Sequence, residues 1–315
     1  MNVSKSPRTV YFNGRIVPES AARVSIFDSA LQVGDMAYEV TRTFHHRPFR
    51  LRDHLRRLRH SMSTLEIDPG LTDDELEQIT LDVLRRNLPT EPADVDWNII
   101  HDVSRGPASA YRSLFSTEEL RPTVVVACLP MAEKMAALAP TYQTGLDAVV
   151  PAQRSIPREL FDPAIKVRSR AHFQLANLQA SAKQRGAMAL LLDPDGFATE
   201  GTSGNVFFVR GGKLQTPTAR NLLPGITRDT VLELARRLNI PAGEADLTQA
   251  EVLAADEAFT TSTSIGIVHL RSIDDRTIGD GRIGPITARL RDALHQEFGL
   301  DIAAQAAAYA ARLRS

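Results

Sequence analysis

The sequence is poor in cysteine, lysine, aromatic residues and net charge. Cys128 is its only cysteine, which excludes an intramolecular disulfide and a cysteine-based metal site, and its setting VVVACLP indicates a buried strand. The formal net charge of -1 at pH 7 gives no basic surface for nucleic acid or for anionic membranes. We therefore predict a protein with no nucleic-acid partner and no bound metal.

Long apolar runs are missing as well. No stretch approaches the length of a membrane span, and the N-terminal MNVSKSPRTV lacks the apolar segment of a signal peptide. The alternating strand and helix patterns come without a GxGxxG fingerprint, so a dinucleotide-binding fold is not indicated. These absences favour a cytoplasmic protein without a membrane partner.

The composition that remains is that of a folded protein with a sizeable core. A chain of 315 residues with 43% hydrophobic and 24% charged residues can bury one large core or two ordinary ones. The connection between the strands VVVACLP and DAVVPAQ places a domain boundary near residues 130 to 140. We predict a mixed α/β (α+β) protein with a small N-terminal domain, residues 1–132, and a larger C-terminal domain, residues 133–315, that ends in an Ala-rich helical tail.

Local patterns predict several elements of the first domain. TVYFNGRIVPES predicts a β-hairpin that turns at Asn13 and Gly14, and a strand is expected from Tyr38 to Phe44. Leucines at helical spacing in LRDHLRRLRHSMSTLEI predict an amphipathic helix. Thr72 stands where it can cap the next helix.

Because lysine is scarce, a reactive lysine can be sought by elimination. The five lysines are Lys5, Lys134, Lys166, Lys183 and Lys213. Four of them lie in polar, linker or turn segments and are expected to be solvated. Lys166 instead follows an apolar pair and precedes a helical pattern, where partial burial beside arginines favours the neutral amine that Schiff-base chemistry needs. A structural role for a lysine at such a junction stays open.

The segments after Lys166 carry motifs in a specific order. TEGTSGNVFFV is followed by KLQTP, then by LLPGITRDTVLELARRL and by ADEAFTTSTSIGIVHL. With these motifs the chain, from Tyr11 to about Asp274, resembles the class IV, or fold-type IV, pyridoxal-phosphate enzymes. This family includes branched-chain aminotransferases, D-amino acid transaminases, (R)-selective amine transaminases and aminodeoxychorismate lyase. The resemblance implies a C-terminal domain with a β-barrel-like core and pyridoxal 5'-phosphate in the cleft between two domains.

One of these motifs, GITR, has a physical logic of its own. Gly225 permits close backbone approach, and the helical pattern DTVLELARRL follows at once. The first N–H groups of a helix are unpaired and lie at the positive end of its dipole, so they can bind a phosphate. Ile226 and Thr227 are predicted to supply these N–H groups, and Thr227 its hydroxyl. A Thr227 that only caps the helix is the alternative.

The resemblance implies roles for the residues at matching positions. Lys166 would be the catalytic residue, forming an internal aldimine with the cofactor, and Glu200 would keep the pyridine nitrogen protonated. Arg57 follows an Asp-His pair at the distance that the family uses for its phosphate-binding arginine. The cofactor-binding residues implied are Arg57, Lys166, Glu200, Asn205, Ile226, Thr227, Thr263 and Ser264.

Candidates for substrate binding lie in the first domain. Tyr38 takes the place of the family's strand tyrosine, and Arg42 lies on the same strand. The strand WNIIHDVSRG breaks at Gly106, and the loop that follows is where the family often recognises the substrate carboxylate. Arg105, Tyr111 and Arg112 are the candidates of this loop, each with an ordinary structural role as the alternative.

The function implied is that of a transaminase that uses an amino donor and a 2-oxo acid acceptor. The donor would be a branched-chain L-amino acid or a D-amino acid. A lyase of the aminodeoxychorismate kind and an (R)-amine transaminase are the alternatives, and a non-catalytic relative is disfavoured because the lysine, the acid and the phosphate motifs are all present. The family's tyrosine five residues after the lysine is replaced by Ala171, beside His172 and Phe173. Relatives also imply a homodimer, because a loop of the partner helps to form their substrate pocket.

Overall fold

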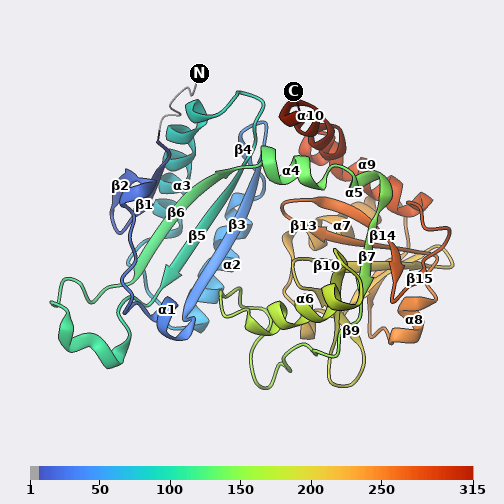
Figure 1. Cartoon of the computed structure of the whole chain (residues 1–315), viewed down its shortest axis with the longest axis horizontal. Coiled ribbons are helices and arrows are strands. Elements are labelled where there is room, and N and C mark those ends of the chain that lie inside the picture. The colour runs from blue at the N-terminus through green and yellow to red at the C-terminus, as the bar shows by residue number, and fades with distance from the viewer. Residues whose placement is uncertain (1–6, 315) are drawn as a thin grey trace. The chain divides into compact units, whose positions relative to one another are not determined.

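The computed structural model describes residues 7–314, which divide into two compact units. The first unit contains the described residues up to Met131 together with Ile165–Ser169; the second contains Ala132–Ala164 and the chain from Arg170 onward. The second domain expected from the sequence included Ile165–Ser169, which the structure groups with the first unit. Helices and strands are mixed in both units (Figure 1), so the predicted α/β class is confirmed.

The first unit is a sheet covered by two long helices. Its elements are β1 Thr9–Phe12, β2 Arg15–Pro18, η1 Glu19–Ala21, α1 Ser29–Val33, β3 Met36–Phe44, β4 Arg47–Pro48, α2 Leu51–Thr64, α3 Asp73–Asn87, η2 Leu88–Thr90, β5 Trp97–Ser104, η3 Ser109–Leu114 and β6 Thr123–Pro130. Six strands of its described residues form one sheet in the order β2-β1-β6-β5-β3-β4. Helix α2 packs against β3, and α3 packs against β1 and β6.

Local sequence chemistry explains how several of these elements begin and end. Asn13 (φ 49°) and Gly14 (φ 90°) both adopt left-handed backbone, as the two-residue turn between β1 and β2 requires. Thr72 caps α3, because its hydroxyl accepts from the Glu75 N–H at 3.2 Å while Glu75 accepts from the Thr72 N–H at 2.7 Å. The predicted hairpin, strand and capped helix are therefore confirmed.

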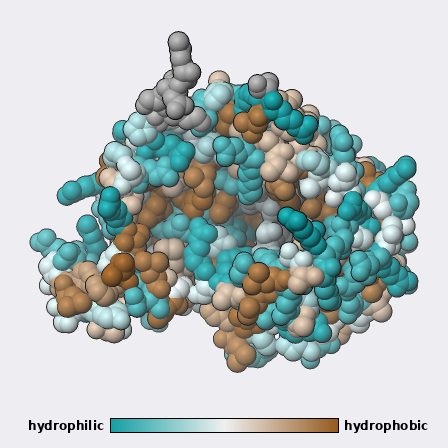
Figure 2. Space-filling view, viewed as in Figure 1, coloured by the Kyte–Doolittle hydropathy of each residue, from teal (hydrophilic) through white to brown (hydrophobic). Residues whose placement is uncertain are grey.

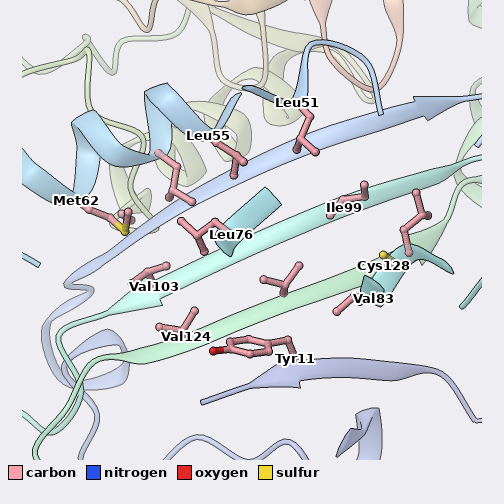
Figure 3. Close-up of a cluster of buried hydrophobic side chains, with 14 of the residues drawn as sticks. Tyr11, Leu51, Leu55, Met62, Leu76, Val83, Ile99, Val103, Val124 and Cys128 are labelled. Carbon is pink, nitrogen blue, oxygen red and sulfur yellow. The ribbon is translucent and has the colours of Figure 1, made fainter. Parts of the chain in front are cut away.

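The core of the first unit lies between the sheet and its helices. Figure 3 shows apolar side chains of α2 and α3 directed at those of β1, β5 and β6. The labelled members are Tyr11, Leu51, Leu55, Met62, Leu76, Val83, Ile99, Val103, Val124 and Cys128. Full burial of each such leucine contributes about 1.5–3 kcal/mol, so α2 is firmly placed. The same helix carries His54, Arg57 and Ser61, whose positions this core therefore fixes.

A short segment from far along the chain extends the edge of β3. The Tyr38 N–H donates to the Lys166 carbonyl at 2.9 Å, and the Arg168 N–H donates to the Met36 carbonyl at 3.0 Å. Ala37 and Val167 form an antiparallel bridge between them. We call Ile165–Ser169 the lysine segment. Lys166 thus lies in paired, strand-like backbone, and the helix that follows begins only at Ala171.

The second unit is built on a larger sheet. Its elements are α4 Ala132–Leu138, α5 Thr141–Thr144, β7 Leu146–Val149, α6 Ala171–Lys183, β8 Met188–Leu192, β9 Ala198–Gly201, β10 Asn205–Arg210, β11 Lys213–Pro217, η4 Ala219–Asn221, α7 Ile226–Arg237, β12 Ala242–Ala245, α8 Gln249–Leu253, β13 Glu257–Ser262, β14 Gly266–Ile273, β15 Arg276–Thr277, α9 Pro285–Phe298 and α10 Ile302–Arg314. Nine strands of its described residues join in the order β12-β11-β10-β13-β14-β7-β8-β9, with β15 on β14. Because β9 also contacts β10 and β11 near the opposite end, the sheet curls into the expected barrel-like core.

The segment MAEKMAALAPTYQTG, expected to be a linker, is helical instead. It forms α4 and α5, and α10 packs against α4. Helix α10 buries Ile302, Ala306 and Tyr309, and α4 buries Met135. Helices as short as α4 take most of their stability from tertiary packing, which local sequence does not reveal. The Ala-rich tail therefore packs locally, within the second unit.

Candidate functional site

Lys166 is fixed at its backbone and placed beside an aromatic ring. Its N–H donates to Ser61 Oγ at 2.9 Å, and its carbonyl accepts from the Tyr38 N–H. Its Nζ lies 4.7 Å from the centre of the Tyr38 ring, within the range of a cation–π interaction. The residue is half-buried. The structure thus brings two of the predicted site residues, Lys166 and Tyr38, together in the first unit.

Ser61 is the residue that ties Lys166 to α2. Its hydroxyl accepts from the Lys166 N–H and donates to the Arg57 carbonyl at 3.0 Å. Ser61 is fully buried, so water does not compete for these two hydrogen bonds. Our sequence analysis missed Ser61, because a serine on an amphipathic helix carries no local signal of a partner 105 positions away.

Arg57 lies in a buried group with Glu39 and His54, which we call the Glu39 cluster. The Arg57 guanidinium donates through Nε and Nη2 to the two carboxylate oxygens of Glu39, both at 2.8 Å. His54 Nδ1 lies 3.1 Å from Glu39 Oε1. The side chain of Glu39 is 0% exposed and that of Arg57 is 10% exposed. This two-point pairing fixes the direction of the guanidinium.

Opposing effects set the charges in the Glu39 cluster. Burial raises the pKa of Glu39, but Arg57 and His54 outweigh burial and hold that pKa well below its usual value. Burial lowers the pKa of His54, against the pull of the Glu39 carboxylate. Glu39 is therefore ionised and balances the charge of Arg57. No sequence pattern indicated this pairing, because an acid in a strand and an arginine in a helix are ordinary in isolation.

The substrate-binding candidates are held in different ways. Arg42 is fully buried in β3, with its guanidinium 4.8 Å from the centre of the Phe44 ring. Tyr111 packs on Phe27 with their ring centres 4.9 Å apart. Arg112 is exposed in η3.

Arg105 is committed to contacts inside the first unit. Its Nε donates to Asp35 Oδ2 at 2.7 Å. Its Nη1 and Nη2 donate to the carbonyls of Glu66 and Leu65 at 3.0 and 2.6 Å. Arg105 therefore ties the loop after β5 to the end of α2, a structural task that differs from the substrate contact expected of it.

In the second unit, Glu200 and Asn205 lie beside the segment that precedes α7. Asn205 Nδ2 donates to the Leu223 carbonyl at 3.0 Å and to Glu200 Oε2 at 3.4 Å. The Leu223 N–H donates to Glu200 Oε1 at 3.4 Å. Both bonds to the carboxylate are long and come from neutral donors, so a charged donor would bind it more strongly.

The N-terminus of α7 begins at the predicted GITR motif. Gly225 is the N-cap, and within residues 7–314 no side chain caps the first turn, so the alternative in which Thr227 caps the helix is wrong. Thr227 is the second helical residue and is buried. A Cβ at Gly225 would lie 2.0 Å from Asn205 Oδ1. A glycine therefore lets α7 start against Asn205 with its first N–H groups unpaired by the helix itself.

Hydroxyl groups gather at the end of β13. Thr263 is half-buried and Ser264 is buried in the turn between β13 and β14. Thr261 stands directly opposite Asn205 in the pairing of β13 with β10, so the two side chains share a face. Thr261 Oγ1 is buried and has no hydrogen-bond partner among the described residues. A bound molecule can supply that partner, so Thr261 joins the candidates that our sequence analysis missed.

The N-terminus of α6 holds the turn after Glu200. Arg170, the N-cap residue, donates through Nη2 to the Thr202 carbonyl, and Thr202 Oγ1 donates to Asn177 Oδ1 at 2.7 Å. Ala171 is exposed, and the rings of His172 and Phe173 lie 4.1 Å apart. Ala171 therefore offers no polar side chain in place of the expected tyrosine.

Two further features were searched for in the described part of the chain. None of the helices in residues 7–314 combines the length and the apolarity needed to cross a bilayer. Those residues also contain no group of three or more His, Cys, Asp or Glu side chains arranged to hold a metal ion.

Comparison with known sequences gives a consistent picture. Residues 36–273 match the family model described as amino-transferase class IV. A putative branched-chain-amino-acid aminotransferase of Methanocaldococcus jannaschii is 34% identical over 284 residues, which cover 90% of this chain and 94% of that protein. The branched-chain-amino-acid aminotransferase of Escherichia coli is 31% identical over 306 residues, which cover 94% of each chain.

Solved structures are similar over nearly the whole chain. The branched-chain amino acid aminotransferase of Escherichia coli superposes with a TM-score of 0.83 and 28% identity, covering 93% of this chain and 95% of its own. That of Thermoproteus uzoniensis, solved with norvaline, gives 0.80 and 27%, covering 96% and 97%. That of T.th., solved with N-(5'-phosphopyridoxyl)-L-glutamate, gives 0.81 and 27%, covering 93% and 95%.

Proposed function

Since this chain belongs to the class IV aminotransferases, we propose that it moves an amino group from an α-amino acid to a 2-oxo acid with pyridoxal 5'-phosphate as its cofactor. Its donor would be a branched-chain L-amino acid or a D-amino acid. Similarity to branched-chain aminotransferases, one of them solved with a phosphopyridoxyl amino acid, supports this proposal. The observation that carries it is Lys166, a half-buried amine whose backbone is fixed beside Tyr38.

The residues of each unit fit such a cofactor by their chemistry. In the second unit, the uncapped start of α7 and the hydroxyls of Thr227, Thr263 and Ser264 suit a phosphate. The unpaired hydroxyl of Thr261 would gain a partner from a bound molecule. In the first unit, we propose that the oriented guanidinium of Arg57 contacts the phosphate.

The proposed chemistry assigns one task to each of two residues. When bound, pyridoxal phosphate supplies an electron sink for the substrate α-carbon. Lys166 Nζ holds the cofactor and, once released by the incoming amine, removes the proton from that α-carbon. Glu200 accepts a hydrogen bond from the ring nitrogen and keeps a proton there.

The substrate proposal rests on β3. Tyr38 and Arg42 are four residues apart on this strand, so their side chains leave the same face of the sheet. We propose that they line the substrate position, together with Tyr111 and Arg112 from the loop after β5. Arg105 is left out, because its guanidinium holds Asp35 and the end of α2.

A half-reaction tests the proposed function. The protein loaded with pyridoxal phosphate is mixed, without an acceptor, with L-leucine, D-alanine, an (R)-amine or aminodeoxychorismate, while the absorbance of the lysine-bound cofactor is followed. Loss of this absorbance with an amino acid identifies a transaminase and its donor, and loss with the amine alone identifies the (R)-amine alternative. Release of pyruvate from aminodeoxychorismate, with the absorbance restored, would contradict amino transfer and identify the lyase.

We also propose that the chain forms a homodimer. Ile26, Leu31 and Val33 around α1 are 64–72% exposed in the first unit, and Leu175 and Leu178 on α6 are exposed in the second. Figure 2 shows apolar, brown patches on the lower part of one face. Large exposed apolar patches on soluble proteins mark interaction sites.

Light scattering tests the homodimer proposal. It should give the mass of a dimer, and Val33→Glu should give a monomer, whereas Leu313→Glu on α10 should stay dimeric. A monomeric wild-type protein at micromolar concentration would contradict the proposal.

A further inference from the structure

Arg168 lies two residues after Lys166 on the lysine segment. In paired, extended backbone, residues two apart direct their side chains to the same face. Both cations meet one aromatic ring: Lys166 Nζ lies 4.7 Å and the Arg168 guanidinium carbon 3.9 Å from the centre of the Tyr38 ring. The two cations are therefore no further apart than these two distances combined.

The Arg168 guanidinium is held in one orientation. Its Nε donates to Asp102 Oδ1 at 2.7 Å, and Asp102 stands opposite Tyr38 in the pairing of β3 with β5. Its Nη1 and Nη2 make no hydrogen bond within residues 7–314, and 38% of the side chain is exposed. An exposed ion pair contributes only about 0–1 kcal/mol. Stability alone therefore does not account for a guanidinium held by its backbone, a ring and a carboxylate.

A fixed guanidinium with free Nη groups suits a carboxylate. Arginine binds carboxylates through two parallel N–H groups, and stacking on a ring leaves that edge available. In an α-amino acid the amine and the carboxylate share one carbon, so the group that binds the carboxylate must lie close to the group that reacts with the amine. Arg168 meets this condition with respect to Lys166.

We propose that Arg168 is a specificity-determining residue that binds the α-carboxylate of the amino-acid and oxo-acid substrates. This inference rests on the proposed function, in which the substrate amine reacts at Lys166. Asp102 and Tyr38 position the guanidinium, and the Nη groups take the carboxylate. The role that the sequence suggested for Arg105, which is occupied elsewhere, falls in this way to a residue of the lysine segment.

Binding of an unreactive acid tests this role. 4-Methylvaleric acid has the carboxylate of a substrate and no amine, and its amide has the same shape without the charge. Calorimetry on the cofactor-loaded protein should show that Arg168→Gln weakens binding of the acid by roughly tenfold to a hundredfold, as expected for a hydrogen bond to a charged group. Binding of the amide should not change. Arg85→Gln, which removes an exposed arginine from α3, should bind both compounds like the wild type.

Two outcomes would overturn the inference. Either Arg168→Gln binds the acid as tightly as the wild type, or it loses affinity equally for the acid and the amide. Arg168→Lys, which keeps the charge without the fork, should lose affinity for the acid several-fold, and it carries the test if Arg168→Gln fails to fold. Borohydride fixation of the cofactor on Lys166 is measured first: its absence in the wild type contradicts the proposed function, whereas its presence with unchanged acid binding contradicts only the role of Arg168.

Discussion

The Glu39 cluster and the N-terminus of α7 are two proposed phosphate-binding regions, one in each unit, that use different physical means. In the first, the binding group is the side-chain cation of Arg57, which a fully buried carboxylate holds in place. In the second, the binding groups are the backbone N–H groups of Ile226 and Thr227, which the helix can present because Gly225 fits against Asn205.

The difference between the two regions predicts which perturbation each one responds to. A charged side chain depends on its counter-charge, on pH and on salt, because Coulomb interactions are screened and carboxylates and imidazoles titrate. A backbone N–H cradle has no titrating group and depends on the position of the chain. Changes of charge should therefore act on the first region, and an added methyl group on the second.

The largest effect is expected from Glu39→Gln. This change leaves Arg57 in a buried place without its counter-charge, and removal of one partner of a buried pair costs about 3–5 kcal/mol. Urea unfolding at pH 7 should show the loss. Asp82→Asn, which breaks the more exposed pairs of Asp82 with Arg85 and Arg86, should cost less than about 1 kcal/mol. Equal losses in the two variants would contradict our account of the Glu39 cluster.

His101, directly opposite Glu39 in the pairing of β3 with β5, should make stability depend on pH. Burial lowers the pKa of His101 from 6.5 to about 4, so as the pH falls the unfolded chain takes up the proton before the folded one. The stabilisation is complete above about pH 6.5 and should be lost between pH 6.5 and 4, by roughly 3 kcal/mol. Urea midpoints over this range measure the loss. His101→Gln should flatten the profile and Thr227→Val should not, and an unchanged profile in His101→Gln would count against the prediction.

Arg57→Lys should weaken the binding of pyridoxal phosphate by at least roughly tenfold, because a point charge does not reproduce the two-point fork. The reason is specific to the first region, where the fork is held by Glu39. Spectroscopic titration at low and high salt measures the affinity. The wild type should lose affinity as salt rises, since charge attracts the phosphate there. Salt-independent binding in both proteins would remove Arg57 from the phosphate site.

Gly225→Ala is expected to have the smallest effect. The added Cβ would meet Asn205 Oδ1 at 2.0 Å, so the start of α7 or Asn205 must shift, at a cost of about 1–3 kcal/mol. Affinity for pyridoxal phosphate should fall several-fold, by the same factor at low and high salt. Gly243→Ala on β12 is the matched control, because no atom lies within 4 Å of its added Cβ. Unchanged affinity in Gly225→Ala would show that the phosphate does not use this helix.

Features that depend on neighbouring residues could be predicted from the sequence. The turn at Asn13 and Gly14, the cap at Thr72 and the start of α7 at Gly225 each follow from the backbone preference or hydrogen bonding of a few adjacent residues. The motif order from Lys166 onward was sufficient to identify the family, which the comparisons confirm.

Features that depend on distant partners could not be predicted. The pairing of the lysine segment with β3, the hydroxyl of Ser61 behind Lys166 and the cover of α4 by α10 join residues that are far apart in the chain. Local periodicity contains no information on such pairs. For the same reason the sequence could not show that Arg105 is held by Asp35 while Arg168 keeps its Nη groups available.

Mass spectrometry after borohydride reduction tests the central claim most directly. The protein is incubated with pyridoxal phosphate, reduced and digested, and the modified peptide is identified. We predict a phosphopyridoxyl group on Lys166 alone, and no modification there once excess L-leucine has converted the cofactor before reduction. A label on Lys183 or Lys213 in place of Lys166, or no label at all, would contradict the assignment of Lys166 as the catalytic residue.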